Sequence, residues 1–179
     1  MKSALLVIDV QRGLFDEPLP PYEAASVVER INALSKRARA AGVPVVFIQH
    51  ENPSGLLAYG SESWQLERNL VIADTDTIVR KTTSDSFLRT TLGAMLSCWT
   101  TEQLVICGYA SEFCVDTTTR RAAALGYQVV LVADAHTTYD KDHASGAQIR
   151  AHHNATLPGI TSFGPLIEAR RAADIAFGA

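Results

Sequence analysis

Several features that mark whole classes of protein are absent from this 179-residue chain or scarce in it. Its 16 lysine and arginine residues are outnumbered by 19 aspartate and glutamate residues, which gives a formal net charge of -3. A chain of this balance has no basic field to hold a phosphate backbone, so no nucleic-acid partner is expected. No apolar run is long enough to cross a membrane, and the run over residues 4–8 is too short for a signal-peptide core. We therefore expect a cytoplasmic protein without a membrane partner.

Cysteine is also scarce. Only Cys98, Cys107 and Cys114 occur, and no pair has the CxxC spacing. A disulfide scaffold or a zinc knuckle is therefore not expected. Cys107 falls inside an apolar run that predicts a strand, and Cys98 follows a helical pattern, so we expect both to be inert packing residues. Cys114 is then the candidate for a reactive thiol.

A glycine-rich nucleotide-binding loop is missing as well. Where a dinucleotide fingerprint would place GxGxxG after the first apolar run, the chain reads DVQRGLF. A non-catalytic nucleotide-binding module on a doubly wound sheet stays among the hypotheses, but it lacks its signature. No internal repeat, low-complexity tract or linker divides the sequence, and we expect residues 1–179 to form a single domain.

What the chain does contain is an alternation of short apolar runs and amphipathic segments. Residues 4–8 are rich in branched side chains, which is typical of a parallel strand buried on both faces. Residues 23–41 carry apolar side chains at helical spacing and stop at Gly42. The repeated order predicts an α/β, three-layer αβα, Rossmann-like fold with a mostly parallel sheet of about six strands and helices on both faces. Further strands are expected over residues 43–48, 77–79, 103–107, 129–132 and 160–163, and further helices over residues 87–96, 111–125, 142–155 and 165–176.

The most informative stretch is GYASEFCVDTTTRRAAALGY, residues 108–127. It follows an apolar strand, and Ser111 is the expected N-cap of a helix that ends at Gly126. Cys114 then lies in the first helical turn, where free N–H groups and the helix dipole favour a thiolate, so we expect a low pKa for this thiol. A nucleophile is one interpretation. The other is a small buried apolar residue, and this segment alone does not choose between them.

Two charged residues at the ends of other strands favour the nucleophile. Asp9 ends the first apolar run, and Lys81 follows the short run over residues 77–79. Taken singly, each is typical of a cap or a solvated charge. In an open parallel sheet, however, ligands bind outside the carboxyl ends of the strands. The chain therefore delivers an acid, a base and a thiol to one edge of the predicted sheet.

Asp9, Lys81 and Cys114 together resemble the Asp-Lys-Cys triad of the isochorismatase-like cysteine hydrolases. The resemblance covers nearly the whole chain, and its motifs stand in family order: LLVIDVQRGLF, VRKTTSDSF, GYASEFCVDTTTRRAAALGYQVVLVADAHTT and HHNATLPGI. It implies that Asp9 is the general base, that Lys81 holds acid and thiolate in register, and that Cys114 attacks a carbonyl carbon to form a thioester. It also implies backbone oxyanion donors at Ala110 and Cys114, and a cis peptide between Tyr109 and Ala110.

The resemblance also bears on cofactors. Zinc-dependent nicotinamidases of the family carry Asp-Trp-His-Pro after the second strand, whereas residues 49–53 read QHENP here. Asn52 stands where a ligand histidine would, and at most His50 and Glu51 remain, which is fewer ligands than a zinc site needs. We therefore expect no metal and no cofactor, and nicotinamidase activity is put in doubt. The chain resembles instead the metal-free branch of streptothricin hydrolase-like, ureido and amide hydrolases.

The leading hypothesis is thus a cysteine-dependent hydrolase that cleaves the C–N bond of a small amide or ureide. The alternative within the family is hydrolysis of a vinyl ether of the isochorismatase type, which does not require the thiol. Phe15, His50, Trp64 and Tyr109 fall on or near the predicted edge and are the candidates for substrate binding, although loop packing explains Trp64 equally well. A homodimer or homotetramer is expected, by resemblance and because an edge strand over residues 160–163 needs cover.

Overall fold

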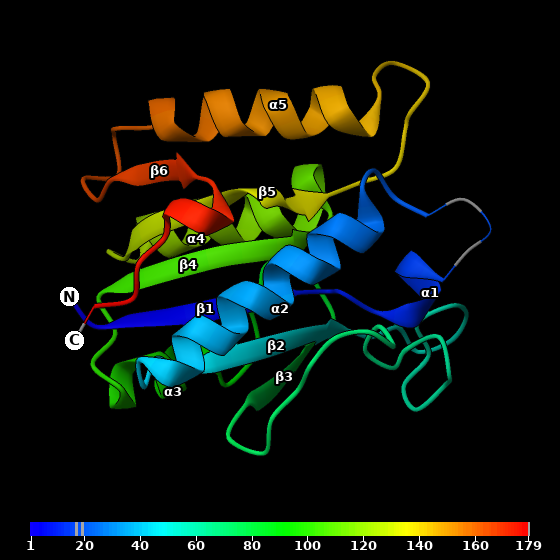
Figure 1. The fold of residues 1–179 in the computed structure, drawn as a ribbon, viewed down its shortest axis with the longest axis horizontal. Helices are drawn as coiled ribbons and strands as arrows, with labels where there is room; N and C mark the ends of the chain where they lie inside the picture. The colour runs from blue at the N-terminus through cyan, green and yellow to red at the C-terminus, as the bar shows by residue number, and fades with distance from the viewer. Residues whose placement is uncertain (17, 19, 179) are drawn as a thin grey trace.

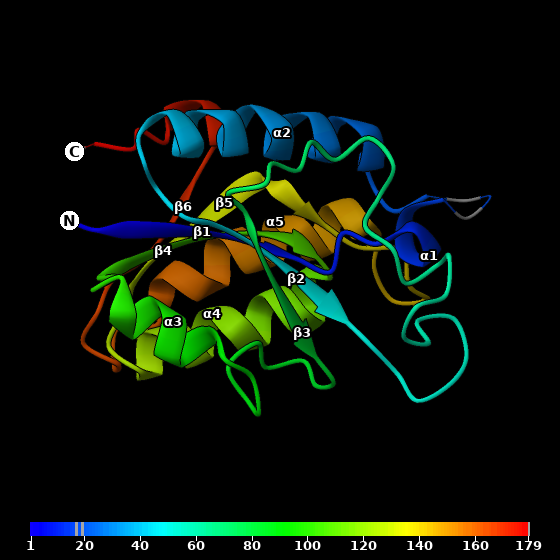
Figure 2. The same ribbon diagram turned by 90° about the horizontal axis from the view of Figure 1, so that it is seen from below.

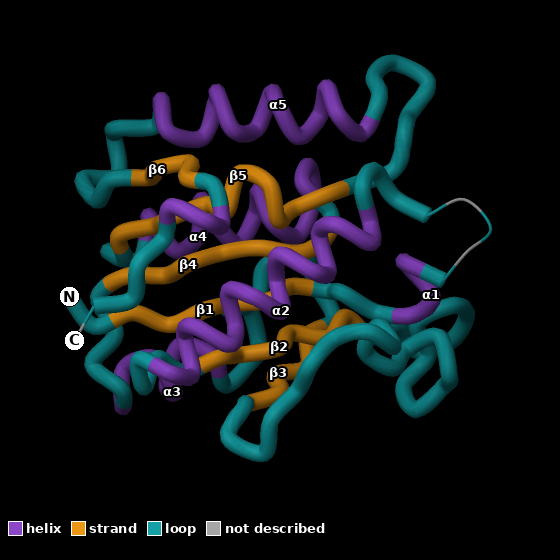
Figure 3. Tube along the Cα trace, viewed as in Figure 1, coloured by secondary structure: helices purple, strands orange, loops and turns teal. Residues whose placement is uncertain are grey.

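The structure, a computed structural model, describes residues 1–16, 18 and 20–178 of the chain. Its strands form one six-stranded sheet in the order β3-β2-β1-β4-β5-β6, and every neighbouring pair is parallel (Figures 1 and 3). The α/β fold expected from the sequence is confirmed. The strands are β1 (Ser3–Ile8), β2 (Val45–His50), β3 (Thr77–Lys81), β4 (Gln103–Tyr109), β5 (Gln128–Thr137) and β6 (Ile167–Arg170).

Helices cover both faces of this sheet. Figure 2 shows α2 on one face and α3 and α4 on the other, while α5 packs against β5 and the turn η1. None of the helices among the described residues is long and apolar enough to cross a membrane. The helices are α1 (Arg12–Phe15), α2 (Ala24–Ala40), α3 (Leu92–Cys98), α4 (Asp116–Ala124) and α5 (Gly146–Thr156), with a π-helical turn η1 (Ser111–Val115) and 3-10 turns η2 (Leu157–Gly159) and η3 (Ala172–Asp174).

The central strands are buried on both faces, as their unbroken apolar sequences predict. Successive side chains of β1 point to opposite faces of the sheet. Leu5 and Val7 belong to the core cluster that includes the buried side chains of α2, whereas Leu6 and Ile8 belong to the cluster that includes those of α3 and α4. The sheet therefore separates two hydrophobic cores, and the polar side chains gather where the strands end.

Two helices show how local sequence sets their bounds. α2 covers nearly the expected range, and its buried stripe includes Val27, Ile31 and Leu34 at helical spacing. α5 begins later than residue 142 because Ser145 caps it. The Ser145 hydroxyl accepts from the backbone N–H of Gln148, whose side chain accepts from the N–H of Ser145. This reciprocal pair is a capping box, and the Ser-x-x-Gln spacing is its signal in the sequence.

The C-terminal part of the chain differs from the expectation. Residues 160–163 form no strand, with a turn over residues 162 and 163, so the strand expected there is wrong, and β6 lies further along the chain. The helix expected over residues 165–176 is also wrong, since this range contains β6 and the short turn η3. Ile167 is buried and pairs with Val129 of β5. Pairing with an existing sheet edge therefore outweighs a helical pattern in a short segment.

The helix expected over residues 87–96 starts later, at Leu92. The segment before it is turned by side chains that bond to the backbone, such as the Asp85 carboxylate that accepts from the N–H of Phe87 at 2.8 Å. Aspartate in this role competes with helix formation. Leu88, which lies in this turned segment, is 45% exposed.

Candidate active site

Parallel pairing brings the ends of several strands to one edge of the sheet. The end of β1 is in register with Gly108 near the end of β4, and the end of β2 pairs with Lys81, the last residue of β3. Asp9 directly follows β1, and Cys114 follows β4 within the turn η1. The acid, the lysine and the thiol expected from the sequence therefore lie together at the carboxyl edge, where open parallel sheets bind ligands.

Lys81 is the centre of this cluster. Its side chain is fully buried, and Nζ lies 2.7 Å from Asp9 Oδ2 and 3.2 Å from Cys114 Sγ. Nζ also lies 3.0 Å from His50 Nδ1 and 3.0 Å from the carbonyl oxygen of Thr83. A buried ammonium is costly unless it is paired and hydrogen-bonded, and these acceptors satisfy it. Since an ammonium has three protons for the four acceptors, the cluster can shift hydrogen bonds among them without losing its cation.

Asp9 is held in an unusual backbone conformation. Its φ angle of 52° falls in the left-handed region, which aspartate tolerates better than most residues. The side chain is 2% exposed, and its Oδ1 atom is buried with no hydrogen-bond partner among the described residues. A carboxylate oxygen of Asp9 and the sulfur of Cys114 lie within 4.8 Å of each other. With Oδ2 bonded to Lys81, Oδ1 is left free to accept a proton.

The connection from β4 to the thiol is a tight turn. Gly108 has a φ of 119°, and a Cβ there would lie 2.1 Å from the carbonyl oxygen of Ile8, so only glycine lets β4 pass this close to β1. The peptide bond between Tyr109 and Ala110 is cis. The turn η1 follows, with the N–H of Val115 bonded to the carbonyl of Ala110 at 3.1 Å. Such single π-helical turns occur frequently at functional sites.

Ser111 does not cap a helix, contrary to the expectation. The N-cap of η1 is Ala110, without a side-chain cap bond, and the Ser111 hydroxyl lies 2.7 Å from His136 Nδ1. Ser111 is fully buried, so its hydroxyl bonds to the imidazole that faces it rather than to the helix. Cys114 accordingly lies in a π-helical turn before α4 and not in the first turn of a long α-helix.

The expected low pKa of Cys114 is also wrong. Burial and the neighbouring Asp9 carboxylate raise the pKa of the Cys114 thiol to about 12, although Lys81 opposes the shift. The cost of desolvating a thiolate outweighs the helix dipole here. Of the other thiols, Cys107 is buried, which raises its pKa, and Cys98 is exposed. The resting site therefore holds a neutral thiol, which needs a base to become a nucleophile.

His50 contacts the cluster directly and is held neutral. Its Nε2 lies 3.3 Å from Asn52 Oδ1, so Nε2 carries the proton and Nδ1 accepts from Lys81. Burial and the Lys81 cation lower the pKa of His50. Glu51 lies apart from the cluster, because Arg80 Nε and Nη2 donate to its carboxylate at 2.7 and 3.0 Å. The segment after β2 therefore supports Lys81 rather than forming a row of metal ligands.

The same atoms decide whether the site could bind a metal ion. Asp9, His50 and Cys114 are the one group of potential ligands among the described residues whose atoms lie within 4.8 Å of one another. Lys81 Nζ, however, bonds to all three. A divalent cation at this point would face an ammonium, so the donor set suits a lysine and does not fit a metal ion. That no metal is needed stays a prediction, which this arrangement supports.

Gln11 is a site residue that the sequence does not predict on its own. Its fully buried amide accepts from the backbone N–H of His50 at 2.9 Å and donates to the carbonyl oxygens of His50 and Trp64 at 3.0 and 2.8 Å. Gln49 donates to the same carbonyl of Trp64 at 3.0 Å. These bonds attach the long connection after β2 to the edge that carries Asp9. The available signal is the position of Gln11 in the DVQ motif, two residues after Asp9.

The expected substrate-binding residues lie in two places. Phe15 and Tyr109 form an edge-to-face pair with ring centroids 6.0 Å apart beside the cis peptide, and Tyr109 makes a second such pair with Tyr139. Trp64 instead packs edge-to-face on Tyr59 at 5.0 Å. His50 thus contacts Lys81 directly, and the Phe15–Tyr109 pair lies beside the turn that follows β4. The Trp64 ring contacts its own loop.

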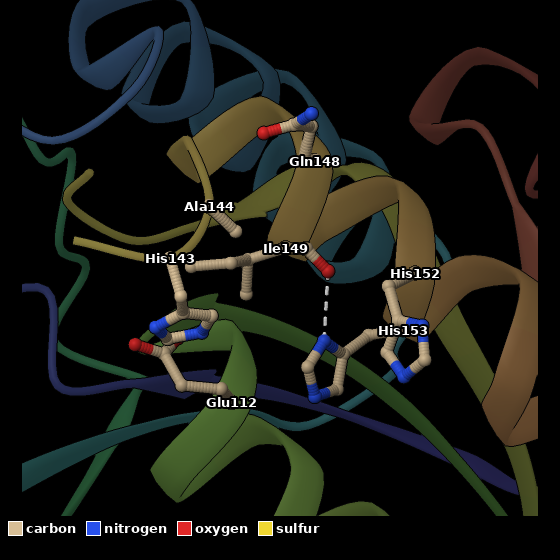
Figure 4. Close-up of a pocket in the computed structure, with 7 residues that line it drawn as sticks. All are labelled: Glu112, His143, Ala144, Gln148, Ile149, His152 and His153. Carbon is tan, nitrogen blue, oxygen red and sulfur yellow. Dashed lines mark hydrogen bonds between the residues drawn. The ribbon is translucent and has the colours of Figure 1, made fainter. Parts of the chain in front are cut away.

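A separate cavity of about 410 Å³ lies between α5 and η1. Figure 4 shows His153 beneath α5, with its Nδ1 bonded to the carbonyl oxygen of Ile149. Its lining, drawn from the described residues, includes no member of the triad. The lining residues are Glu112, His143, Ala144, Gln148, Ile149, His152 and His153.

Comparison with known proteins agrees with the fold. A streptothricin hydrolase of Streptomyces noursei is 38% identical over 98% of this chain, which spans 59% of the length of that protein. A ureidoacrylate amidohydrolase of Pseudomonas syringae is 28% identical over 75% of this chain and 70% of its own. The crystal structure of an isochorismatase family protein, 35% identical, superposes with a TM-score of 0.85 over 93% of this chain and 96% of its own. The isochorismatase domain model matches residues 3–162, and the chain belongs to the isochorismatase family.

Proposed function

We propose that this protein is a cysteine-dependent hydrolase that cleaves the C–N bond of a small amide or ureide through a thioester on Cys114. The observation that carries the proposal is the position of Lys81 Nζ, within hydrogen-bond distance of both Asp9 Oδ2 and Cys114 Sγ. A nucleophile, a base and a cation that orients both are the parts that covalent acyl transfer needs.

The reaction starts from the neutral thiol. Asp9 takes the proton of Cys114 as the sulfur attacks the carbonyl carbon, and the negative charge moves to the carbonyl oxygen. When the C–N bond breaks, Asp9 returns the proton to the departing nitrogen, and a thioester remains on the sulfur. Water then attacks the thioester carbon with Asp9 again accepting a proton, the C–S bond breaks, the acid product leaves, and Asp9 returns the proton to the sulfur to restore the thiol. Lys81 stays protonated throughout and offsets the negative charge that passes between carboxylate and sulfur.

Backbone N–H groups of Ala110 and Cys114 serve as the oxyanion donors in this mechanism. Both belong to the turn that follows β4, so their positions depend on how that turn is held. Phe15 and Tyr109 form the aromatic side of the substrate site, and His50 lies on the side of Lys81. Trp64 is the fourth candidate, and its ring packs on Tyr59 in the long connection after β2.

Release of ammonia or amine from a panel of small amides and ureides, with streptothricin included, tests the proposal. The relatives that hydrolyse streptothricin and ureidoacrylate, as their names state, motivate these choices. Cys114→Ala should abolish hydrolysis, while Cys98→Ala, the matched change at an exposed thiol, should leave it intact. Hydrolysis that survives Cys114→Ala would favour the vinyl ether alternative. Activity that is lost to a chelator and restored by zinc would contradict the metal-free reading of the donor set.

We further propose that the protein acts in the cytoplasm as a homodimer or homotetramer. The support is the family resemblance together with the two edges of the sheet, β3 and β6, which lack a further strand among the described residues. The edge strand that needs cover is thus β6 and not the range 160–163. Light scattering that finds a monomer at micromolar concentration would overturn the oligomer.

A further inference from the structure

A second buried polar cluster begins at the turn that carries Cys114. Ser111 Oγ lies 2.7 Å from His136 Nδ1, and His136 Nε2 lies 2.9 Å from Asn154 Oδ1. Ser111 and His136 are both fully buried, and Asn154 is partly buried on α5. The three residues come from η1, β5 and α5, which are distant in sequence. None of them takes part in the proposed proton transfers.

The directions of these hydrogen bonds follow from Asn154, at the α5 end of the cluster. Asn154 Nδ2 donates to the carbonyl oxygen of Ala133 at 2.8 Å, so Asn154 Oδ1 faces His136 and accepts from its Nε2–H. His136 Nδ1 is then an acceptor, and the Ser111 hydroxyl donates to it. Burial lowers the pKa of His136 to about 4, so the ring is neutral and this tautomer is kept at physiological pH. Each hydrogen bond between Asn154 on α5 and Ser111 thus has a fixed donor and a fixed acceptor.

Asn154, at the α5 end of the cluster, bonds to an irregular part of the sheet. Ile106 of β4 pairs with Leu131 of β5, but Gly108 pairs with His136, so β5 inserts extra residues over 132–135. Ala133 lies in this bulge, and Asn154 satisfies its carbonyl group. Bulges of this kind redirect side chains near active sites. Here the bulge returns His136 to the level of Gly108, directly beside the turn.

We propose that Ser111, His136 and Asn154 form a neutral relay that positions the turn carrying the oxyanion donors. Ser111 follows Ala110 directly, so fixing its hydroxyl limits the rotation of the peptide groups on either side of it. The relay acts through that turn and does not touch substrate, because its serine and histidine are inaccessible. The inference rests on the proposed hydrolase function and adds three positioning residues to it.

Kinetics of Ser111→Ala provide the first test. A small displacement of a reacting group costs up to about 10²-fold in rate, so we expect kcat to fall by roughly 10- to 100-fold with KM within about threefold. Ser111→Thr, which keeps the hydroxyl, should recover most of the loss. Ser35→Ala is the matched control, because Ser35 is equally buried on α2 and its hydroxyl has no partner among the described residues. A double variant with Asn154→Ala should be no slower than the slower single variant, since both break one chain.

Two measurements need no substrate. Hydrogen exchange of the peptide over residues 109–115 should be faster in Ser111→Ala and Asn154→Ala than in wild type, and unchanged in Ser35→Ala. Alkylation of Cys114 by iodoacetamide, measured in a Cys98→Ser background, should stay within about twofold in Ser111→Ala, because alkylation forms no oxyanion.

The outcomes separate the relay from the hydrolase. Unchanged exchange, or a loss of kcat that only follows the fraction of unfolded protein, would overturn the relay while leaving the triad intact. Hydrolysis by wild type that does not depend on Cys114 would overturn the proposed function, and the exchange data would still decide whether the turn is held by Ser111. A Ser111→Thr variant that folds, restores fast hydrolysis and restores slow exchange would support the relay in full.

Discussion

The turn that carries Cys114 contacts two buried polar clusters that are built on opposite principles. At Cys114 the partners are ionic, with a buried ammonium bonded to a carboxylate and close to a thiol. At Ser111 the partners are neutral, and each hydrogen bond has one donor and one acceptor fixed by its neighbours. In the Lys81 cluster the ammonium has more acceptors around it than protons to donate. In the relay through His136 each hydrogen bond joins one donor to one acceptor.

Because of this difference, we expect the two clusters to have different functions. A site with surplus acceptors can move a proton without leaving its charges unsatisfied. A chain in which every bond has a fixed direction resists such movement and holds geometry instead. Substitutions that change charge should therefore act most strongly at Lys81 and Asp9, and substitutions that change shape or hydrogen bonding should act most strongly at Ser111 and His136.

The largest effect is expected from Asp9→Asn, which removes the base and keeps the shape of the side chain. Positioned proton transfer is typically worth about 10²- to 10⁴-fold, so kcat for amide hydrolysis should fall by that factor, with little change in KM. Steady-state kinetics together with circular dichroism measure both the loss and the fold. Wild-type kcat in a folded variant would remove the ionic cluster from proton transfer.

Lys81→Met should be the most destabilising of the substitutions considered. It leaves the Asp9 carboxylate buried without its cation, and breaking a buried pair in this way typically costs about 3 to 5 kcal/mol of unfolding free energy. Urea denaturation measures the change. Arg80→Met is the matched control on the same strand, because the Arg80 side chain is 48% exposed and its partner Glu51 can be solvated instead. Equal stability of the two variants would show that burial does not distinguish the cluster from a surface pair.

The neutral relay predicts a pH dependence of stability. Its histidine has a folded pKa of about 4 against an ordinary value near 6.5, so between these pH values the unfolded chain binds more protons than the folded one. Stability should therefore fall as pH drops from about 6.5 to about 4, by about 3 kcal/mol from His136 alone. Urea denaturation of wild type and His136→Gln at several pH values isolates this contribution. Parallel curves for the two proteins would contradict a neutral buried imidazole.

The smallest effect concerns thiol reactivity and reverses an expectation from the sequence. Because burial and Asp9 raise the pKa of Cys114, iodoacetamide should label the exposed Cys98 first in native protein at pH 7. Lys81→Met should slow labelling of Cys114 further, since Lys81 favours the thiolate. Mass mapping of the labelled peptides measures both effects. Labelling of Cys114 before Cys98 in wild type would show that Lys81 outweighs burial and that the resting thiol is already ionised.

Sequence by itself determined the framework of this protein. The unbroken apolar runs of β1, β2 and β4 predict strands buried on both faces, and strand and helix order then predicts a parallel sheet. In such a sheet the carboxyl ends share one edge, so Asp9, Lys81 and Cys114 are brought together by topology alone. These inferences depend on local pattern and connectivity, which is why no tertiary contact was needed to make them.

The tertiary structure decided everything that depends on a neighbour distant in sequence. The partner of Ser111 is an imidazole placed by a bulge in β5, and the thiol of Cys114 is shifted by burial and by Asp9, more than 100 residues away. β6 likewise forms where β5 offers a free edge and not where the local pattern suggests a strand. Hydrogen-bond direction, desolvation and strand pairing are properties of the surroundings, and the surroundings exist only once the chain has folded.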